Sequence, residues 1–275
     1  MPPIRHALSA PMATRPRQLR APPFDDVLPA PIWFRADDLP SDTEYPRHRH
    51  AWGEFVYAYS GVMELMLSDR HLMAPPQYGV WLPAQVEHVG LNRHAASHCS
   101  LYVSEALCAA LPREACALTV SPLVRAMLEH LRRHAHAAPP TAEEARLLQV
   151  LVDQLALAPR AGSYLPGSED PVLAPVLRAL EEDPGDERSL AELAQAFHTT
   201  ERTLLRRCRR ELGMSFSEWR QRLRVVKALP RLQAGRKVEA VALELGYASA
   251  SAFITMFKRL MGMTPDEFRR GAVGG

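Results

Sequence analysis

The chain has 275 residues, enough for two domains that each bury a core of their own. Its 47% hydrophobic content is that of a soluble globular protein, and no apolar run approaches the ~18–20 residues that a membrane span requires. The net charge of +2 hides an asymmetry, because residues 171–275 carry 18 basic against 13 acidic side chains while residues 1–170 carry 15 against 18. Within 201–237, 12 basic residues accompany 3 acidic ones, which favours a nucleic-acid partner over a merely solvated face.

Residues 1–23 contain Pro, Ala and Arg without an apolar central segment, so we expect a disordered tail and no secretory signal. The chain has four cysteines, and their spacing matches neither a CxxC motif nor a zinc finger. A reduced, cytoplasmic context is therefore expected.

Residues 24–105 are predicted to form a β domain. Short alternating apolar stretches broken by Pro and Gly fill 30–104 and indicate the antiparallel strands of a β sandwich or small barrel. Four aromatic residues in it are candidates for lining an effector pocket, although such residues more often fill a core: Trp52, Tyr57, Tyr59 and Trp81.

The same segment holds two histidine motifs. His48, His50, Glu54 and Gly61 give H-x-H-x3-E-x6-G, and alternate residues on a strand share a face, so the three polar side chains can point inward together. Residues 83–92 follow as P-x-Q-x2-H-x3-N and contain His88.

Together these motifs resemble the two metal-binding motifs of the cupin family of small β barrels. The resemblance implies that His48, His50, Glu54 and His88 hold a divalent metal, for which Zn, Ni, Fe(II), Mn and Cu are all suitable. The alternative is that these residues line the barrel mouth without binding a metal. Two glutamines, Gln77 and Gln85, stand where the second motif usually has glycine.

Residues 106–158 are predicted to be helical and to pair two copies of the chain. One amphipathic helix is marked by Leu123, Met127, Leu128 and Leu131, and another by Leu147, Leu148, Leu151, Val152 and Leu155. Several histidines here and nearby are expected on the surface: His94, His98, His130, His134 and His136. Residues 159–170, with Pro, Gly and Ser, indicate an interdomain linker.

Residues 171–272 are predicted to be helical and contain a repeat. The runs Leu190-Ala-Glu-Leu-Ala and His198-Thr-Thr recur 48 residues later as Val238-Glu-Ala-Val-Ala and Gly246-Tyr-Ala. In the second copy, Gly246 supplies a turn with positive φ and Ser249 caps the following helix. Two helix-turn-helix units joined by a helix near 217–233 are predicted, which can reach two successive major-groove faces of DNA.

This doubled arrangement resembles the DNA-binding domain of the AraC family of bacterial transcription regulators, most strongly at 246–265. The resemblance implies a first recognition helix after Thr200 that presents Arg202, Leu205, Arg206 and Arg209 to DNA. It implies a second after Ser249 that presents Ala250, Ser251, Ile254 and Thr255, with Lys258 and Arg259 near phosphates. Arg206 is the strongest candidate for a base contact, because a guanidinium binds guanine O6 and N7 together; a phosphate contact is the open alternative.

Two positions depart from the family pattern. His198 stands where the family usually has glycine, so the first turn is expected to be tighter or shifted. Pro230 falls inside the linking helix and is expected to kink it or end it early.

AraC-type regulators often carry a cupin-like sensor domain, so the two resemblances support one another. They imply an α+β regulator, not an enzyme, whose barrel senses a small molecule or metal and controls binding to double-stranded promoter DNA. A homodimer is implied, and RNA polymerase is a further partner if the protein is an activator. The alternative is a metal-dependent cupin enzyme of dioxygenase or isomerase type fused to a DNA-binding domain. No dedicated acid–base pair accompanies the metal candidates, which disfavours it.

Overall fold

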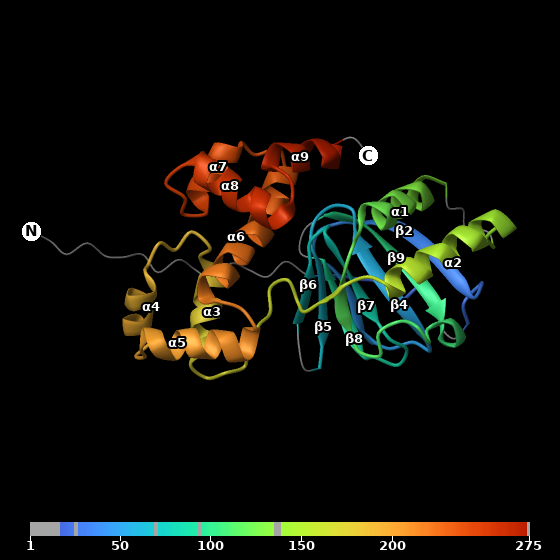
Figure 1. Ribbon diagram of the computed structural model, residues 1–275, viewed down its shortest axis with the longest axis horizontal. Coiled ribbons are helices and arrows are strands. Elements are labelled where there is room, and N and C mark those ends of the chain that lie inside the picture. Colours follow the sequence, from blue (N-terminus) through green and yellow to red (C-terminus); the bar gives the residue numbers. More distant parts are fainter. Residues whose placement is uncertain (1–16, 25–26, 69–70, 93–94, 135–138, 274–275) are drawn as a thin grey trace, which may run out of the picture.

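A computed structural model describes residues 17–24, 27–68, 71–92, 95–134 and 139–273. A sheet-rich N-terminal domain lies beside a helical C-terminal domain, with a connecting segment between them (Figure 1). The α+β class expected from the change of hydrophobic period along the chain is confirmed. Among the described helices, none combines the length and apolar character needed to cross a membrane.

The strands of the N-terminal domain form two sheets. One has the order β1-β3-β8-β5-β6 and the other the order β11-β10-β7-β4-β9-β2. The strands are β1 (Gln18–Leu19), β2 (Ile32–Leu39), β3 (Thr43–His48), β4 (Trp52–Ala58), β5 (Met63–Leu67), β6 (His71–Ala74), β7 (Tyr78–Leu82), β8 (His88–Asn92), β9 (Ala96–Ser104), β10 (Cys116–Thr119) and β11 (Arg160–Ala161).

Strand β4 shows how this domain separates its two faces. Trp52, Glu54 and Val56 point to a cavity between the sheets. Phe55 and Tyr57 point the other way and belong to a second core beneath the helices. Successive side chains on a strand point to opposite faces, so one strand can serve a polar cavity and an apolar core at once.

Helices α1 (Pro122–His134) and α2 (Ala142–Ala156) cover the outer face of the six-stranded sheet (Figure 1). The buried face of α1 runs through Val124, Met127, Leu128 and Leu131, spaced i, i+3, i+4 and i+7. Leu123, which we placed on that face, is 53% exposed, because the helical period runs back from Met127 and Leu128 to Val124.

Two expected boundaries of the β domain differ from the structure. Residues 1–16 of the expected disordered tail lie outside the described residues, but β1 pairs with β3 in parallel, with Gln18 opposite Thr43. The sheet also continues past residue 105, since β10 pairs with β7 and β11 pairs with β10. The expected linker therefore begins as an edge strand, too short for its alternation to be seen in the sequence.

The C-terminal domain is a single helical core around α6. Its helices are α3 (Leu173–Glu182), α4 (Leu190–Ala196), α5 (Glu201–Arg207), a π-helical turn (Cys208–Leu212), α6 (Phe216–Gln233), α7 (Val238–Glu244), α8 (Ala250–Met261) and α9 (Pro265–Val273). Trp219 of α6 and Phe253 and Phe257 of α8 are fully buried in this core. A capping box at Ser189 and Glu192 begins α4.

Helix α6 does not end at Pro230, as one form of the prediction had it. It continues to Gln233, and Gly235, with φ +76°, closes its C-terminal end. A proline removes the hydrogen bond to the carbonyl four residues back, here that of Val226. Because Pro230 lies in the last turn, the rest of the helix keeps its bonds.

Candidate functional sites

Three histidines of the barrel converge on one point. His48 lies at the end of β3, His50 in the loop before β4, and His88 at the start of β8. One ring nitrogen from each lies within 4.8 Å of the others. His48, His50 and Glu54, which the sequence predicts to point inward together, all line the cavity between the sheets, and His88 joins them there.

Each imidazole is held through its Nδ1 atom. The Nδ1 of His48 lies 2.7 Å from the Pro46 carbonyl, that of His50 2.7 Å from the Trp52 carbonyl, and that of His88 2.9 Å from the Val86 carbonyl. A carbonyl accepts only, so Nδ1 of each ring is the donor in this bond, and Nε2 is the atom left to bind a metal or, in His50, to bond Glu54. This is the outer-shell arrangement that orients metal-ligating histidines.

Glu54 completes the group from the floor of the site. Its Oε2 lies 3.1 Å from the Nε2 of His50 and 3.8 Å from that of His88. Burial is the strongest single influence and acts to raise the pKa of Glu54, but the hydrogen bond from His50, the charges of His50 and His88 and a hydrogen bond from Ser100 together outweigh it and lower the pKa to about 2. Burial is likewise the strongest single influence on His50 and acts to lower its pKa, but the hydrogen bond to Glu54, the charge of Glu54 and the bond to the Trp52 carbonyl together outweigh it and raise that pKa. The pair is thus an ion pair that shares the His50 proton.

The donor set fits a divalent transition metal. Imidazole nitrogens with a carboxylate beside them are ligands that such ions take, and the three ring nitrogens already lie within 4.8 Å of one another. Burial lowers the pKa of His88, which keeps that ring neutral and able to ligate. A metal at this point would displace the His50 proton and free Glu54 to act as a fourth ligand or to balance charge.

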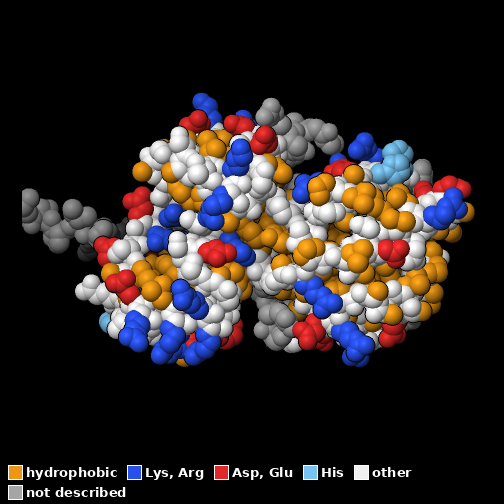
Figure 2. All heavy atoms as spheres, in the orientation of Figure 1, with side chains coloured by type: hydrophobic (Ala, Val, Ile, Leu, Met, Phe, Trp, Pro, Cys, Tyr) orange, Lys and Arg blue, Asp and Glu red, His pale blue; other side chains and the backbone are white. Residues whose placement is uncertain are grey.

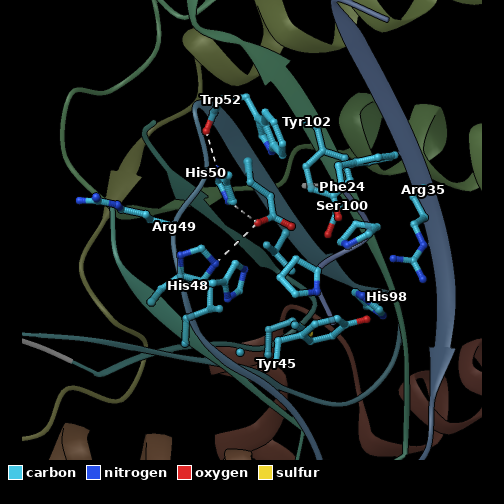
Figure 3. A pocket seen from close by; sticks show the side chains of 18 residues that line it. Phe24, Arg35, Tyr45, His48, Arg49, His50, Trp52, His98, Ser100 and Tyr102 are labelled. Carbon is cyan, nitrogen blue, oxygen red and sulfur yellow. Dashed lines mark hydrogen bonds and ion pairs between the residues drawn. The ribbon is translucent and has the colours of Figure 1, made fainter. Parts of the chain in front are cut away.

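The histidines form one wall of a cavity of about 180 Å³ between the two sheets. Figure 3 shows His48 and His50 on one side of it and Arg35 and His98 on the other. The remaining lining is polar and aromatic toward the top of the view, at Trp52, Ser100 and Tyr102, and aliphatic at Val56, Met63 and Leu65.

Phe24 packs against the aromatic end of the cavity. Its ring makes edge-on contacts with Trp33, Trp52 and Tyr102, at centroid separations of 6.2, 6.3 and 5.3 Å. Edge-to-face pairs at these separations are favourable. They hold residues 22–24 in place as part of the cavity wall.

Of the four aromatic residues predicted for an effector pocket, only Trp52 lines this cavity. Tyr57, Tyr59 and Trp81 lie on the opposite face of β4 and β7, in or against the core beneath the helices. There the Tyr59 hydroxyl donates to the Leu128 carbonyl at 2.8 Å. Strand alternation places these three side chains on the face that points away from the cavity. For them the alternative interpretation given above, that they fill a core, is the correct one.

Other cavity residues had no assigned role in the sequence prediction. Arg35 on β2, Tyr45 on β3, and Ser100 and Tyr102 on β9 all line it. His98, expected on the surface, is 7% exposed, and its Nδ1 lies 3.1 Å from the Asp37 carbonyl. For the two residues on β9, the sequence did offer a signal that could have identified them: His98 and Ser100 are polar residues at alternate positions, which share one face of a strand.

The other unassigned histidines and the two glutamines can also be placed. His130 and His134 are exposed on α1 as expected, while His94 and His136 lie outside the described residues. Gln85 adopts φ +65°, the left-handed conformation of the glycine it replaces in the second motif. Gln77 instead contacts the C-terminal domain, where its Nε2 donates to the Met261 carbonyl at 3.4 Å.

The first helix-turn-helix presents a basic face. Thr200 caps α5 by accepting a hydrogen bond from the Thr203 N–H at 3.2 Å. Leu204 and Cys208 are buried on the inner side. The four predicted DNA-facing residues are all exposed and share one face: Arg202, Leu205, Arg206 and Arg209. Figure 2 shows basic side chains gathered over this part of the molecule.

The second helix-turn-helix presents a smaller, less charged face. Ser249 caps α8 by accepting from the Ala252 N–H at 3.3 Å. Three predicted residues are exposed: Ser251, Thr255 and Lys258. Ala250 and Ile254 are half-buried against the core. Arg259 is exposed, and its Nη2 donates to the Gln221 side chain of α6 at 2.5 Å.

The two turns have the same backbone structure. In the second, the N–H of Gly246 donates to the Leu243 carbonyl, and φ of Gly246 is +71°. In the first, the N–H of His198 donates to the Gln195 carbonyl, and φ of His198 is +52°. The expectation of a tighter or shifted first turn is therefore wrong. His198 takes up the left-handed conformation that glycine adopts at this position, at the steric cost of its Cβ.

Comparison with known proteins agrees with a chain made of a sheet-rich domain followed by a helix-turn-helix domain. Residues 35–197 match the model of an AraC-like ligand-binding domain, and residues 193–271 match that of a helix-turn-helix domain. The chain is 35% identical over 223 residues to the HTH-type transcriptional regulator NimR of Escherichia coli, covering 81% of each protein. This chain belongs to the AraC family of transcription regulators.

Further AraC-family relatives match over shorter regions. The HTH-type transcriptional activator RhaS of Escherichia fergusonii is 32% identical over 126 residues, 45% of each chain. Among solved structures, ToxT of Vibrio cholerae aligns with 88% of this chain and 99% of its own, at 13% identity and a TM-score of 0.38. Membership of this family makes the chain a DNA-binding, effector-sensing regulator and not an enzyme, so the alternative of a cupin enzyme is set aside.

In this AraC-family regulator, the segment between the domains contacts both of them. On the barrel side, the Tyr164 N–H donates to the Met73 carbonyl at 3.0 Å. On the helical side, Arg222 of α6 donates to the Tyr164 carbonyl at 3.1 Å and stacks over the Tyr164 ring at 5.1 Å. Trp219 donates to the Pro166 carbonyl at 2.8 Å. Strand β6, the linker and α6 are thus joined by direct bonds.

The end of the linker is bonded to the first DNA-binding unit through Asp170. Its Oδ1 accepts from the N–H groups of Val172 and Leu173, both at 3.0 Å, at the start of α3. Its Oδ2 pairs with Arg207 and, at 3.1 Å, with Arg210. Burial acts to raise the pKa of Asp170, but these N–H donors and Arg207 outweigh it and lower the pKa.

Proposed function

We propose that this regulator controls promoter binding through a small effector that occupies the barrel cavity together with a divalent transition metal. The metal is held by His48, His50 and His88, with Glu54 beside it. The observation that carries this proposal is the common orientation of the three rings, each bonded through Nδ1 to a backbone carbonyl. An apolar core has no need of three oriented imidazoles, whereas a metal site depends on them. Such an ion would act as a Lewis acid toward an oxygen of the effector.

For DNA, we propose that α5 reads sequence and α8 anchors the domain. The exposed face formed by α5 and the π-helical turn after it carries three arginines, Arg202, Arg206 and Arg209, which suit base and phosphate contacts alike, with Arg206 at its centre. The exposed face of α8 is made of small side chains, with Lys258 and Arg259 placed for phosphates. Small side chains allow close approach to the duplex but carry little base discrimination.

Coupling between the two sites is proposed to run through the linker. Met63 and Leu65 of the cavity wall lie on β5, which pairs with β6. Strand β6 is bonded to the linker, and the linker to α6. An effector that favours one position of this chain of contacts shifts the population of DNA-binding states by its difference in affinity for them.

Assembly and activation are further parts of the proposal. Helices α1 and α2 leave three large apolar side chains exposed, Leu123, Val150 and Leu157, which supports a homodimer formed through these helices. Contact with RNA polymerase is proposed for the case in which the protein acts as an activator. Sedimentation analysis of the wild type and of a Leu123→Glu variant tests the proposed dimer. We expect the variant to shift toward the monomer.

Elemental analysis of protein purified without chelator tests the metal site. We expect about one equivalent of a transition metal in the wild type and almost none in the His48→Ala/His50→Ala variant, because the remaining donors bind too weakly. The matched control is His130→Ala/His134→Ala, which removes two exposed histidines from α1. Equal metal content in the wild type and the His48/His50 variant contradicts the proposed site.

A further inference from the structure

One wall of the barrel cavity carries excess positive charge. The guanidinium groups of Arg35 and Arg20 both bond the same Oδ2 atom of Asp37, at 2.7 and 3.2 Å. One carboxylate cannot neutralise two guanidinium ions, so one positive charge is left over. Arg35 is the member of this trio that lines the cavity, and its side chain is 33% exposed.

The opposite wall does not cancel this charge. Among the described residues that line the cavity, Glu54 is the only carboxylate, and it is already paired with His50. Arg49 also borders the cavity, but its side chain points away from it in Figure 3. A divalent metal on the three histidines adds further positive charge. In a cavity partly closed to water, such a charge is screened weakly and favours an anionic occupant.

The rest of the lining describes the body of that occupant. Trp52, Tyr102 and Phe24 give aromatic surfaces at one end, and Val56, Met63 and Leu65 give an aliphatic floor. Trp52 is only 5% exposed, and its indole Nε1–H is buried without a hydrogen-bond partner. A buried donor of this kind is costly while it stays unpaired.

Volume limits the occupant further. The cavity measures about 180 Å³, less than the ~300–1,000 Å³ of sites that take drug-sized ligands. One ring with a short substituent fits such a space, whereas an oligosaccharide or a long acyl chain does not. The three requirements are a small size, a flat apolar body and a negative charge with acceptor oxygens.

We infer that the effector is a small one-ring carboxylate, bound with its anionic group between the metal and the Arg35 side of the cavity and its ring against the aromatic end. This inference rests on the proposed metal site. It names a chemical class of effector that neither the family nor the histidine motifs specify.

Paired ligands of equal shape and different charge test it. Full-length protein loaded with Zn²⁺ is titrated by calorimetry with benzoate, phenylacetate and nicotinate, and with benzamide, phenylacetamide and nicotinamide. At least one carboxylate is expected to bind about tenfold or more tightly than its own amide, as the loss of a hydrogen bond to a charged group implies. If no carboxylate binds at millimolar concentration, or if each amide binds as well as its acid, the inference is overturned.

Arg35→Gln provides the matching change on the protein. Asp37 keeps Arg20 as its partner in this variant, so the local fold has a reason to survive. Carboxylate binding is expected to weaken about tenfold while amide binding stays the same. Arg47→Gln is the control, because Arg47 pairs with Glu87 on the surface and does not line the cavity. Unchanged carboxylate binding in Arg35→Gln overturns the inference.

Zinc content separates this inference from the proposed function. The zinc content is expected to be the same in the wild type and in Arg35→Gln, because the proposed ligands of the ion are the three histidines and Arg35 is not a ligand. If zinc binds with the expected stoichiometry but acids and amides bind alike, the inference on effector class fails and the metal site stands. If the His48→Ala/His50→Ala variant retains its zinc, the proposed site itself fails.

Discussion

Gly185 and Gly246 touch through their backbones and thereby fasten the two helix-turn-helix units together. A Cβ placed on Gly246 would lie 2.5 Å from the Gly185 carbonyl oxygen. Arg224 of α6 braces the same junction, donating to the carbonyls of Pro184 and Asp186 at 3.2 Å each and lying 5.0 Å over the Tyr247 ring. The loop before α4 and the turn before α8 therefore form one rigid contact.

Gly246→Ala is expected to lower the free energy of unfolding by at least about 3 kcal/mol, combining a left-handed alanine with a backbone clash. The matched control is Gly262→Ala, at φ +72° with nothing within 4 Å of its added Cβ. That control carries the backbone strain alone, about 1–2 kcal/mol. Urea unfolding of both variants measures the difference, and equal losses would show that the contact with Gly185 is unimportant.

His198→Gly is expected to stabilise the protein by about 0.5 kcal/mol. Glycine removes the strain of a left-handed residue that carries a Cβ, and the greater conformational entropy of glycine in the unfolded chain cancels part of this gain. The same substitution in the middle of α1, His130→Gly, should instead destabilise by about 0.3–0.5 kcal/mol. Thermal unfolding of the two variants side by side gives the comparison. A lower Tm for His198→Gly than for the wild type contradicts the account of the first turn.

Arg206→Ala is expected to weaken binding to DNA sequences that the full-length protein selects from a random library. A lost bidentate contact to guanine costs about 1–3 kcal/mol and relaxes preference at one base pair. A lost phosphate contact weakens binding to all sequences alike and reduces the salt slope by about 1. Fluorescence anisotropy at several salt concentrations distinguishes the two. Arg146→Ala, on the exposed face of α2, is the control, and binding equal to wild type in Arg206→Ala rejects the assigned helix face.

Asp170→Asn is expected to destabilise the protein at neutral pH but progressively less in acid. The folded pKa of Asp170 is depressed, so its contribution is present above the ordinary carboxyl pKa of ~3.9 and is lost as the pH falls through the lower folded value. Asparagine keeps an oxygen for the α3 N–H groups but loses the charge that pairs with Arg207 and Arg210. Unfolding measured from pH 7 to pH 2 should show the two curves converging only below about pH 3.9.

Asp153→Asn, an exposed position on α2, controls for the same chemical change on the surface. A constant difference between wild type and Asp170→Asn across this pH range would contradict the role of the ionised carboxylate.

Much of the helical domain was predictable from the sequence because its signals are local. Ser249 and Thr200 cap the helices that follow them, and the apolar period of α8 places Phe253 and Phe257 inside. The residues of the histidine motif were predictable from their spacing along the chain, although His50 lies in the loop between β3 and β4 and not on one strand with His48 and Glu54. These features depend on neighbours within about one turn or one strand.

The errors in the predicted lining of the cavity concern contacts between distant segments. Tyr57 and Trp81 could not be told from Trp52 by type, because only the pairing of the strands decides which face meets the helices and which meets the cavity. His98 was expected on the surface because it belongs to no local motif, but β9 places it in the lining of the cavity.

The sequence by itself determined the class of this protein, because capping residues, helical period and the repeated turn act over short range and are written in neighbouring residues. Only the tertiary structure decided what surrounds the histidines and how the two domains are joined. Arg35 and His98 come from separate strands to the same cavity, and Asp170 meets Arg207 across 37 positions of chain. Such meetings follow from the packing of whole sheets and helices, which no local pattern encodes.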